Sequence, residues 1–161
     1  MIFDSVEEFA LELLEKRPIL GLDLGEKTIG VAVSDNELKI ASGLKTINRK
    51  KFNLDIQLLI QVINNREIAG IILGLPRNMN GSEGPRCQST RAFARNMSIV
   101  IDIPISFWDE RLSTVVAERS LLEANVSRKR RAEVVDYVAA SYILQGALDR
   151  IQIFKRRAIE K

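Results

Sequence analysis

Alternation of large and small side chains in the first quarter of the chain predicts a β-hairpin. Leucines fill every second position from residue 20 to 24, and the run from Thr28 to Ser34 repeats this spacing after a short Gly-Glu-Lys segment. A strand turns alternate side chains to opposite faces, so this pattern suits strands with one bulky and one small face. We predict strands over residues 19–24 and 28–34, joined by a turn, and a third strand within residues 40–47.

From residue 52 onward, helical and strand-like patterns alternate. Residues 52–63 place apolar side chains on one helical face, whereas AGIILGLP, from residue 69, is apolar throughout, as in a strand buried on both faces. Helices are also predicted over about residues 87–100 and 132–150, and a further strand ends at Asp109. A helix capped by Ser113 or Thr114 is expected after it.

This order of elements predicts an α/β fold. Three antiparallel strands followed by alternating helices and strands form a mixed five-stranded sheet that helices cover on both faces. Residues 1–17 carry a separate helical pattern, with Ser5 and Glu8 at capping-box spacing and Pro18 closing the segment. We expect this helix to be appended to a single domain of residues 18–150, with a basic tail over residues 151–161.

Composition limits the chemistry that such a domain can perform. The 161 residues contain no histidine and one cysteine, Cys87, which excludes histidine triads, conventional zinc-hydrolase sites and an intramolecular disulfide. Hydrolysis would therefore depend on carboxylates and on metal ions that prefer oxygen ligands. There is no apolar stretch of membrane-spanning length and no secretory signal pattern. We expect a cytoplasmic protein without a membrane partner.

Charge is unevenly distributed along the chain. The formal net charge is only +3, but residues 124–161 carry nine basic and four acidic side chains, against two basic and five acidic in residues 1–17. The C-terminal part is therefore the side that we expect to face a polyanion.

One acidic residue interrupts the first predicted strand. Asp23 alternates with Gly21 and Gly25, so the strand face that carries the carboxylate has no bulky side chain. The second strand repeats this design with Gly30 and Ala32. Small residues on one face indicate that another element or a ligand approaches closely. The alternative is that Asp23 is a turn residue that hydrogen-bonds its own backbone.

Two further acids are predicted to reach the same face. Asp136 shares a helical stripe with Ala139, Ala140 and Ile143, and the alanines allow that stripe to lie near a glycine-rich strand. Glu110 follows the last predicted strand, at the carboxyl end where ligands collect in open α/β sheets. Convergent carboxylates repel one another unless cations compensate them. Two Mg²⁺ or Mn²⁺ ions would do so, and would activate a water for phosphodiester hydrolysis.

Each of these acids also has a simpler interpretation. Asp136 is equally compatible with a solvated helix position. Glu110 is compatible with a pair to Arg111 or with a cap on the following helix, which would leave Asp109 as the ligand in its place. The joint occurrence of the three acids favours the functional hypothesis.

Four segments stand out together: GLDLGEKTIGVAVSD, GLPRNMNGSEGPR, WDERLST and SRKRRAEVVDYVAASYIL. In this order they resemble the YqgF family, also called RuvX, over about residues 18–149. The resemblance implies a ribonuclease H-like fold and a divalent-metal nuclease with Mg²⁺ or Mn²⁺ as cofactor. It also implies that Asp23, Glu110 and Asp136 form the catalytic and metal-binding set.

The chain departs from the family pattern at a few positions. Glu26 stands where the family usually has threonine, and Asn80 where it usually has aspartate. Ala139 and Ala140 follow Asp136 where related junction resolvases have positions for a further acid, which argues against a resolvase.

Polar and cationic residues near these motifs are candidates for nucleic-acid contact. The loop after Gly74 is rich in glycine and arginine, and a basic run precedes the helix that carries Asp136. An ordinary connecting loop and a solvated helix entry are the alternatives. We expect phosphate contacts, which depend steeply on salt, from these residues: Lys27, Arg77, Asn78, Ser82, Arg86, Arg111, Arg128, Lys129, Arg130 and Arg131.

By resemblance, the leading hypothesis is a nuclease that processes the 5′ end of the pre-16S ribosomal RNA in ribosome biogenesis. Its expected partner is RNA or a ribosomal particle, and it would act as a monomer or homodimer. A Holliday junction resolvase acting on DNA is the first alternative. A noncatalytic, nucleic-acid-binding assembly factor is the second. The Asp-x-Gly turn also occurs in actin-like ATPases, but these need two such domains.

Overall fold

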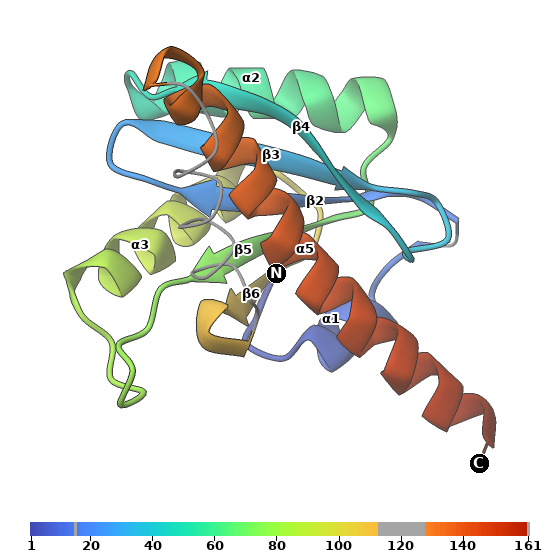
Figure 1. Ribbon diagram of the computed structural model, residues 1–161. Coiled ribbons are helices and arrows are strands. Elements are labelled where there is room, and N and C mark those ends of the chain that lie inside the picture. Colours follow the sequence, from blue (N-terminus) through green and yellow to red (C-terminus); the bar gives the residue numbers. More distant parts are fainter. Residues whose placement is uncertain (15, 113–127, 161) are drawn as a thin grey trace.

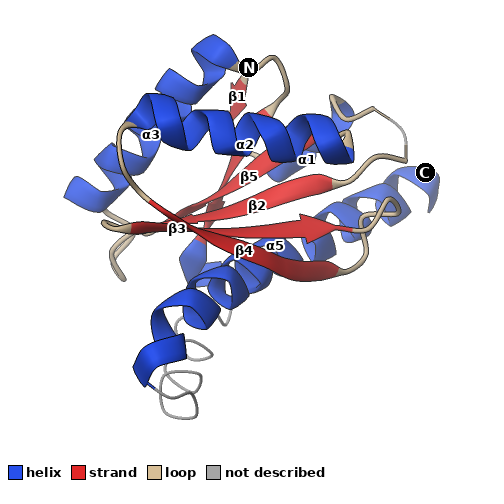
Figure 2. Ribbon diagram, turned by 90° about the horizontal axis from the view of Figure 1, so that it is seen from above, coloured by secondary structure: helices blue, strands red, loops and turns tan. Residues whose placement is uncertain are grey.

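The computed structural model describes residues 1–14, 16–112 and 128–160, and for residues 128–133 and 160 it describes the backbone alone. One mixed sheet of six strands runs through the molecule, with the order β1-β6-β5-β2-β3-β4 (Figure 2). The strands are β1 (Ile2–Phe3), β2 (Ile19–Leu24), β3 (Thr28–Ser34), β4 (Ala41–Asn48), β5 (Gly70–Leu75) and β6 (Ile105–Asp109). The predicted α/β class and the hairpin are confirmed.

Strand direction divides the sheet into two parts. β2, β3 and β4 are antiparallel neighbours, whereas β2, β5, β6 and β1 pair in parallel. The helices are α1 (Val6–Leu11), α2 (Phe52–Arg66), α3 (Pro85–Val100) and α5 (Arg128–Glu160), and a 3₁₀ turn, η1, covers Glu110–Leu112. The helix expected after Ser113 or Thr114 lies outside the described residues. No described helix is long and apolar enough to cross a bilayer.

Helices cover both faces of the sheet, and each face has its own core (Figures 1 and 2). On one face, Leu20 and Leu22 of β2 pack with Leu59 of α2 and Met97 of α3. On the other, α5 crosses the sheet diagonally and packs together with α1. Because successive side chains of β2 alternate between these cores, the leucines face α2 and α3, whereas the Gly21 and Asp23 positions face α5.

The N-terminal segment differs from the appendage expected from the sequence. Ile2 and Phe3 pair with β6 as a sixth strand, where five strands were predicted, because a two-residue strand leaves no periodic pattern to detect. Ser5 caps α1 as predicted, and its hydroxyl accepts the Glu8 N–H at 3.3 Å. Phe9 is fully buried, and a Cβ at Gly70 would lie 2.7 Å from its ring. The segment is thus part of the core.

The final helix continues beyond the predicted end near residue 150. Residues 151–160, expected as a tail, belong to α5, and Ile151 is fully buried in the same cluster as Phe9 of α1. Packing against the N-terminal segment therefore accounts for the start of this extension, and the hydrophobic spacing along α5 alone does not reveal it.

The close approach of α5 to the sheet generates a stability prediction. A Cβ at Gly30 would run into the backbone of Asp136, so Gly30→Ala should force α5 away from β3. We expect a loss of about 1–3 kcal/mol in the free energy of unfolding, measured by urea titration. Gly84→Ala is the matched control, because its nearest neighbour atom would be at an ordinary 3.6 Å. Equal effects of the two substitutions would contradict the prediction.

Candidate active site

Asp23 lies near the carboxyl end of β2, on the face covered by α5, and is only 6% exposed. Glycine stands beside it on both neighbouring strands. Gly30 of β3 is its paired residue, and Gly74 of β5 is the next position after the pair formed by Leu22 and Leu73. These glycines leave the space on both sides of Asp23 free of strand side chains.

Asp136 is brought to this place by the packing of α5. Its backbone carbonyl lies directly over Gly30, the partner of Asp23 in the sheet. The predicted helical stripe is confirmed, since Ala139, Ala140 and Ile143 are all fully buried. The Thr28 hydroxyl donates a hydrogen bond of 2.6 Å to the Asp136 carboxylate, which orients that side chain toward the start of β3.

Glu110 approaches from the opposite side. It begins η1 directly after β6, and its Oε1 lies 2.8 Å from the position that a Cβ would take at Gly74. The Glu110 side chain therefore lies over β5 at Gly74 and extends toward β2. The structure therefore places Asp23, Glu110 and Asp136 on one face and at one end of the sheet.

Asp109 has a different environment from its neighbour. β6 turns Trp108 toward α5 and Phe107 toward α2 and α3, so alternation directs Asp109 away from the α5 face. Its carboxylate forms an ion pair of 2.6 Å with the Arg111 guanidinium. The hydrogen bonds from Arg111 hold the pKa of Asp109 below its ordinary value. Asp109 therefore has a structural partner, and Glu110 is the better placed candidate.

Comparison with known proteins identifies the family of this chain. The chain matches the model of the RuvX family, described as Holliday junction resolvase, over residues 17–150. The chain belongs to the RuvX family. It is 68% identical to a protein of Ruegeria sp. (strain TM1040) over 152 residues, which cover 94% of this chain and 97% of the relative. It is 60% identical to a protein of Paracoccus denitrificans, covering 97% and 99%. Both relatives are named "Putative pre-16S rRNA nuclease".

Solved structures show the same fold. Thermus thermophilus RuvC in complex with a Holliday junction substrate superimposes with a TM-score of 0.53 at 10% identity, over 84% of this chain and 96% of that one. A second structure of Thermus thermophilus RuvC gives a TM-score of 0.51 at 12% identity, over 84% and 97%. At these identities the likeness establishes the RuvC-like fold of this RuvX chain and nothing of its substrate.

The donor atoms of the three acids suit a hard divalent cation. Asp23, Glu110 and Asp136 offer only carboxylate oxygens, which Mg²⁺ and Mn²⁺ prefer. The Asp136 backbone covers Gly30 and the Glu110 side chain covers Gly74, so that both acids approach the strands where a Cβ would block them. Among the described residues, however, no three acidic or cysteine side chains already lie close enough together to hold an ion. The residue types fit such a cofactor, and the positions do not define its coordination.

Several residues that were predicted to contact nucleic acid form hydrogen bonds or ion pairs within the loop between β5 and α3. The Asn78 side-chain amide donates to the Ser82 hydroxyl at 2.9 Å, and the Asn78 backbone N–H donates to the Ser82 carbonyl at the same distance. Gly81 completes the turn with a φ of +87°. Arg77 lies 3.5 Å from Glu83.

The remaining predicted cations differ in how far the structure describes them. Arg111 pairs with Asp109, whereas Lys27 and Arg86 are exposed and pair with no carboxylate in the described part of the chain. Arg128, Lys129, Arg130 and Arg131 form the first turn of α5, and their side chains lie outside the description.

Sequence reasoning missed two residues of the site. Thr28 has no motif of its own, and its partner Asp136 lies 108 positions away in the sequence. Arg49 follows β4, and one of its terminal N–H groups donates to the Gly25 carbonyl at 2.5 Å. No sequence pattern marks either residue. Only the structure shows that both lie beside the turn between β2 and β3.

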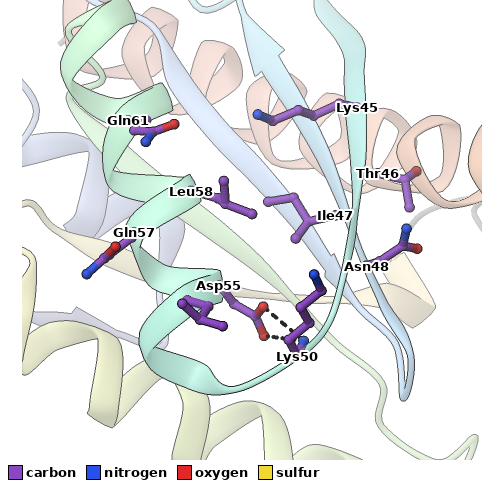
Figure 3. Close-up of a pocket in the computed structure, with 10 residues that line it drawn as sticks. Lys45, Thr46, Ile47, Asn48, Lys50, Asp55, Gln57, Leu58 and Gln61 are labelled. Atoms are coloured by element: carbon purple, nitrogen blue, oxygen red, sulfur yellow. Dashed lines mark hydrogen bonds between the residues drawn. The ribbon is translucent and has the colours of Figure 1, made fainter.

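A separate hollow of about 480 Å³ lies between β4 and α2 (Figure 3). Lys45, Lys50 and Gln61 border it, and Asp55 is the single acid among its described lining residues. That carboxylate accepts the Lys50 backbone N–H at 3.0 Å, as the dashed lines show. With one acid already hydrogen-bonded, this hollow lacks the donors of a carboxylate metal centre.

The Asp109–Arg111 pair generates a pH prediction. The Arg111 guanidinium holds the pKa of Asp109 below its ordinary value in the folded protein, so the pair stabilises the fold above the ordinary aspartate pKa, and this stabilisation is lost as the pH falls through the lowered pKa. Arg111→Gln should therefore lower the free energy of unfolding at about pH 6, and this effect should shrink as the pH falls below the ordinary pKa range of an aspartate. Urea titrations of both proteins across this range measure the difference. A difference independent of pH would contradict the assignment.

Proposed function

We propose that this chain is a divalent-metal-dependent nuclease that hydrolyses phosphodiester bonds of the pre-16S ribosomal RNA, acting in the cytoplasm on RNA or a ribosomal particle. Membership of the RuvX family and the names of its relatives support a nuclease. The observation that carries the proposal is the placement of Asp23, Glu110 and Asp136 at one end of one sheet face, with Gly30 and Gly74 between them.

Each acid has a distinct part in the proposed site. Asp23 is fixed by the backbone of a central strand, and its low exposure keeps the carboxylate away from bulk water. Asp136 is oriented by the Thr28 hydroxyl. Glu110 reaches over Gly74 from a 3₁₀ turn. Bound Mg²⁺ or Mn²⁺ would supply an activated water and stabilise the charge on the leaving oxygen.

The remaining requirement is positive charge that attracts the RNA backbone to closely packed acids. Glycine at positions 30 and 74 lets Asp136 and Glu110 approach the sheet beside Asp23, because a Cβ at either position would meet one of these two residues. Arg86 in the first turn of α3, exposed and without an acidic partner among the described residues, offers positive charge toward the phosphates.

A four-way DNA junction is the second candidate substrate. The description of the RuvX family as Holliday junction resolvase favours it, and the fold shared with RuvC is compatible with it. The names of the high-identity relatives favour RNA. The two substrates are therefore compared directly in the experiment.

Asp23→Asn should abolish cleavage while preserving the fold. We expect the rate on a labelled pre-16S RNA fragment to fall more than about 100-fold, beyond the usual effect of an outer-shell residue. Asp102→Asn, at an exposed position two residues after α3, is the matched control and should retain full activity. The assay uses Mg²⁺, Mn²⁺ or chelator, with a DNA junction in parallel. Cleavage that survives Asp23→Asn or chelation would refute the metal mechanism, and cleavage of the junction alone would refute RNA as substrate.

Thr28→Val should lower the cleavage rate, because the Asp136 carboxylate would lose the hydrogen bond that orients it. Loss of the hydroxyl removes the 2.6 Å hydrogen bond to Asp136, and we expect a reduction of about 10- to 100-fold in kcat. Thr28→Ser keeps the donor and should restore most of the activity. Equal rates for the valine and serine variants would show that the hydroxyl does not position Asp136.

A further inference from the structure

A hollow of about 270 Å³ lies beside the turn that follows Asp23. Gly25 and Glu26 form one wall, Arg49 a second, and Arg86 and Ser89 of α3 a third. Pockets for drug-sized ligands usually begin near about 300 Å³. The space therefore suits one phosphodiester group with part of its sugar better than a complete nucleotide.

Arg49 is held in place before any ligand binds. Its terminal N–H donates to the Gly25 carbonyl at 2.5 Å, and its guanidinium lies 5.7 Å from the centre of the Phe93 ring. Its backbone N–H donates to the Lys27 carbonyl at 2.8 Å. A guanidinium fixed in this way loses little conformational freedom on binding, and its fork of donors matches a phosphate.

The charges around the hollow favour an anion. Arg49 and Arg86 pair with no carboxylate in the described ranges, whereas Arg77, Arg91 and Arg111 nearby are each bound to an acid. Ser89 adds a hydroxyl donor. Glu26 is the one acidic side chain among the described lining residues, so two cations face one anion.

The position of the hollow relates it to the proposed reaction centre. Gly25 follows directly after the end of β2, two residues beyond Asp23. Leu24 and α3 line the hollow, so the hollow lies at the same end of the sheet as Asp23 but on the face opposite α5. An RNA strand that crosses this end of the sheet, with its scissile phosphate at Asp23, would bring another of its phosphates to Arg49 and Arg86.

We propose that the hollow between Arg49 and Arg86 binds a non-scissile phosphate of the RNA substrate. The inference rests on the proposed function for the identity of the polymer, and it adds a second anchor that sets the register of the strand. Arg49 and Arg86 are the binding residues, and the ligand is a phosphodiester, recognised by charge and by the geometry of paired N–H donors.

A scan with neutral linkages tests this proposal. A short single-stranded RNA carries one methylphosphonate at each position in turn, and its Kd is measured in chelator, where no cleavage occurs. Wild-type protein should lose about tenfold in affinity when the contacted phosphate becomes neutral. Arg86→Gln should bind unmodified RNA about tenfold more weakly and show no further loss at that position.

Three further variants make the result specific. Arg49→Gln should behave like Arg86→Gln, with its folding checked by urea titration because Arg49 also contacts Gly25. Glu26→Gln removes the opposing charge and should tighten binding about two- to fivefold. Arg95→Gln changes the same charge at an exposed α3 position outside the hollow lining and should retain the wild-type profile.

The outcomes separate this proposal from the nuclease assignment. If Arg49→Gln and Arg86→Gln keep the wild-type sensitivity to every neutral linkage, or if wild type shows none, the phosphate site is refuted even where the RNA is cleaved. If the predicted loss occurs but no metal permits cleavage of RNA, the phosphate site stands and the nuclease proposal fails.

Discussion

Close packing of α5 on a glycine-lined sheet face is the constraint on which the rest of the structure depends. Side chains at positions 21, 30 or 43 would collide with Leu144, with the Asp136 backbone or with Tyr137. The loss of apolar side chains on the strands is offset by Ala139, Ala140 and Leu144 of the helix, all fully buried. Because the helix backbone rests directly on the strands, the position of Asp136 relative to Asp23 is set by main-chain contact.

Ion pairs divide the cationic side chains into two groups with different roles. Arg91 binds Glu83 at 2.6 Å and Asp4 at 3.0 Å, so it joins the N-terminal segment to the loop before α3. Arg111 joins η1 to the same loop through the Met79 carbonyl while it neutralises Asp109. These residues stabilise the surroundings of the site. Arg49 and Arg86 are among the cations that pair with no carboxylate in the described part of the chain, so they suit the proposed phosphate contact.

Sequence patterns predicted the parts of the molecule that depend on periodicity and missed those that depend on contacts between distant segments. The bounds of β2 and β3 were predicted correctly because alternation is a local property. β1 is too short for a pattern, and α5 continues because Ile151 meets α1. Likewise, the sequence left open whether Asp109 or Glu110 pairs with Arg111, and the structure shows the pair at Asp109. The sequence also gave no indication of Thr28 as the partner of Asp136.

The three acids of the proposed site belong to elements that the fold holds in different ways. Asp23 belongs to a central strand and Asp136 to a long helix packed against it, so neither backbone is free to move without disturbing the core. Glu110 begins a three-residue 3₁₀ turn and has the longer side chain. We infer that the main chain of β2 and of α5 fixes Asp23 and Asp136 in the proposed site, whereas the position of Glu110 depends on the short turn that follows β6.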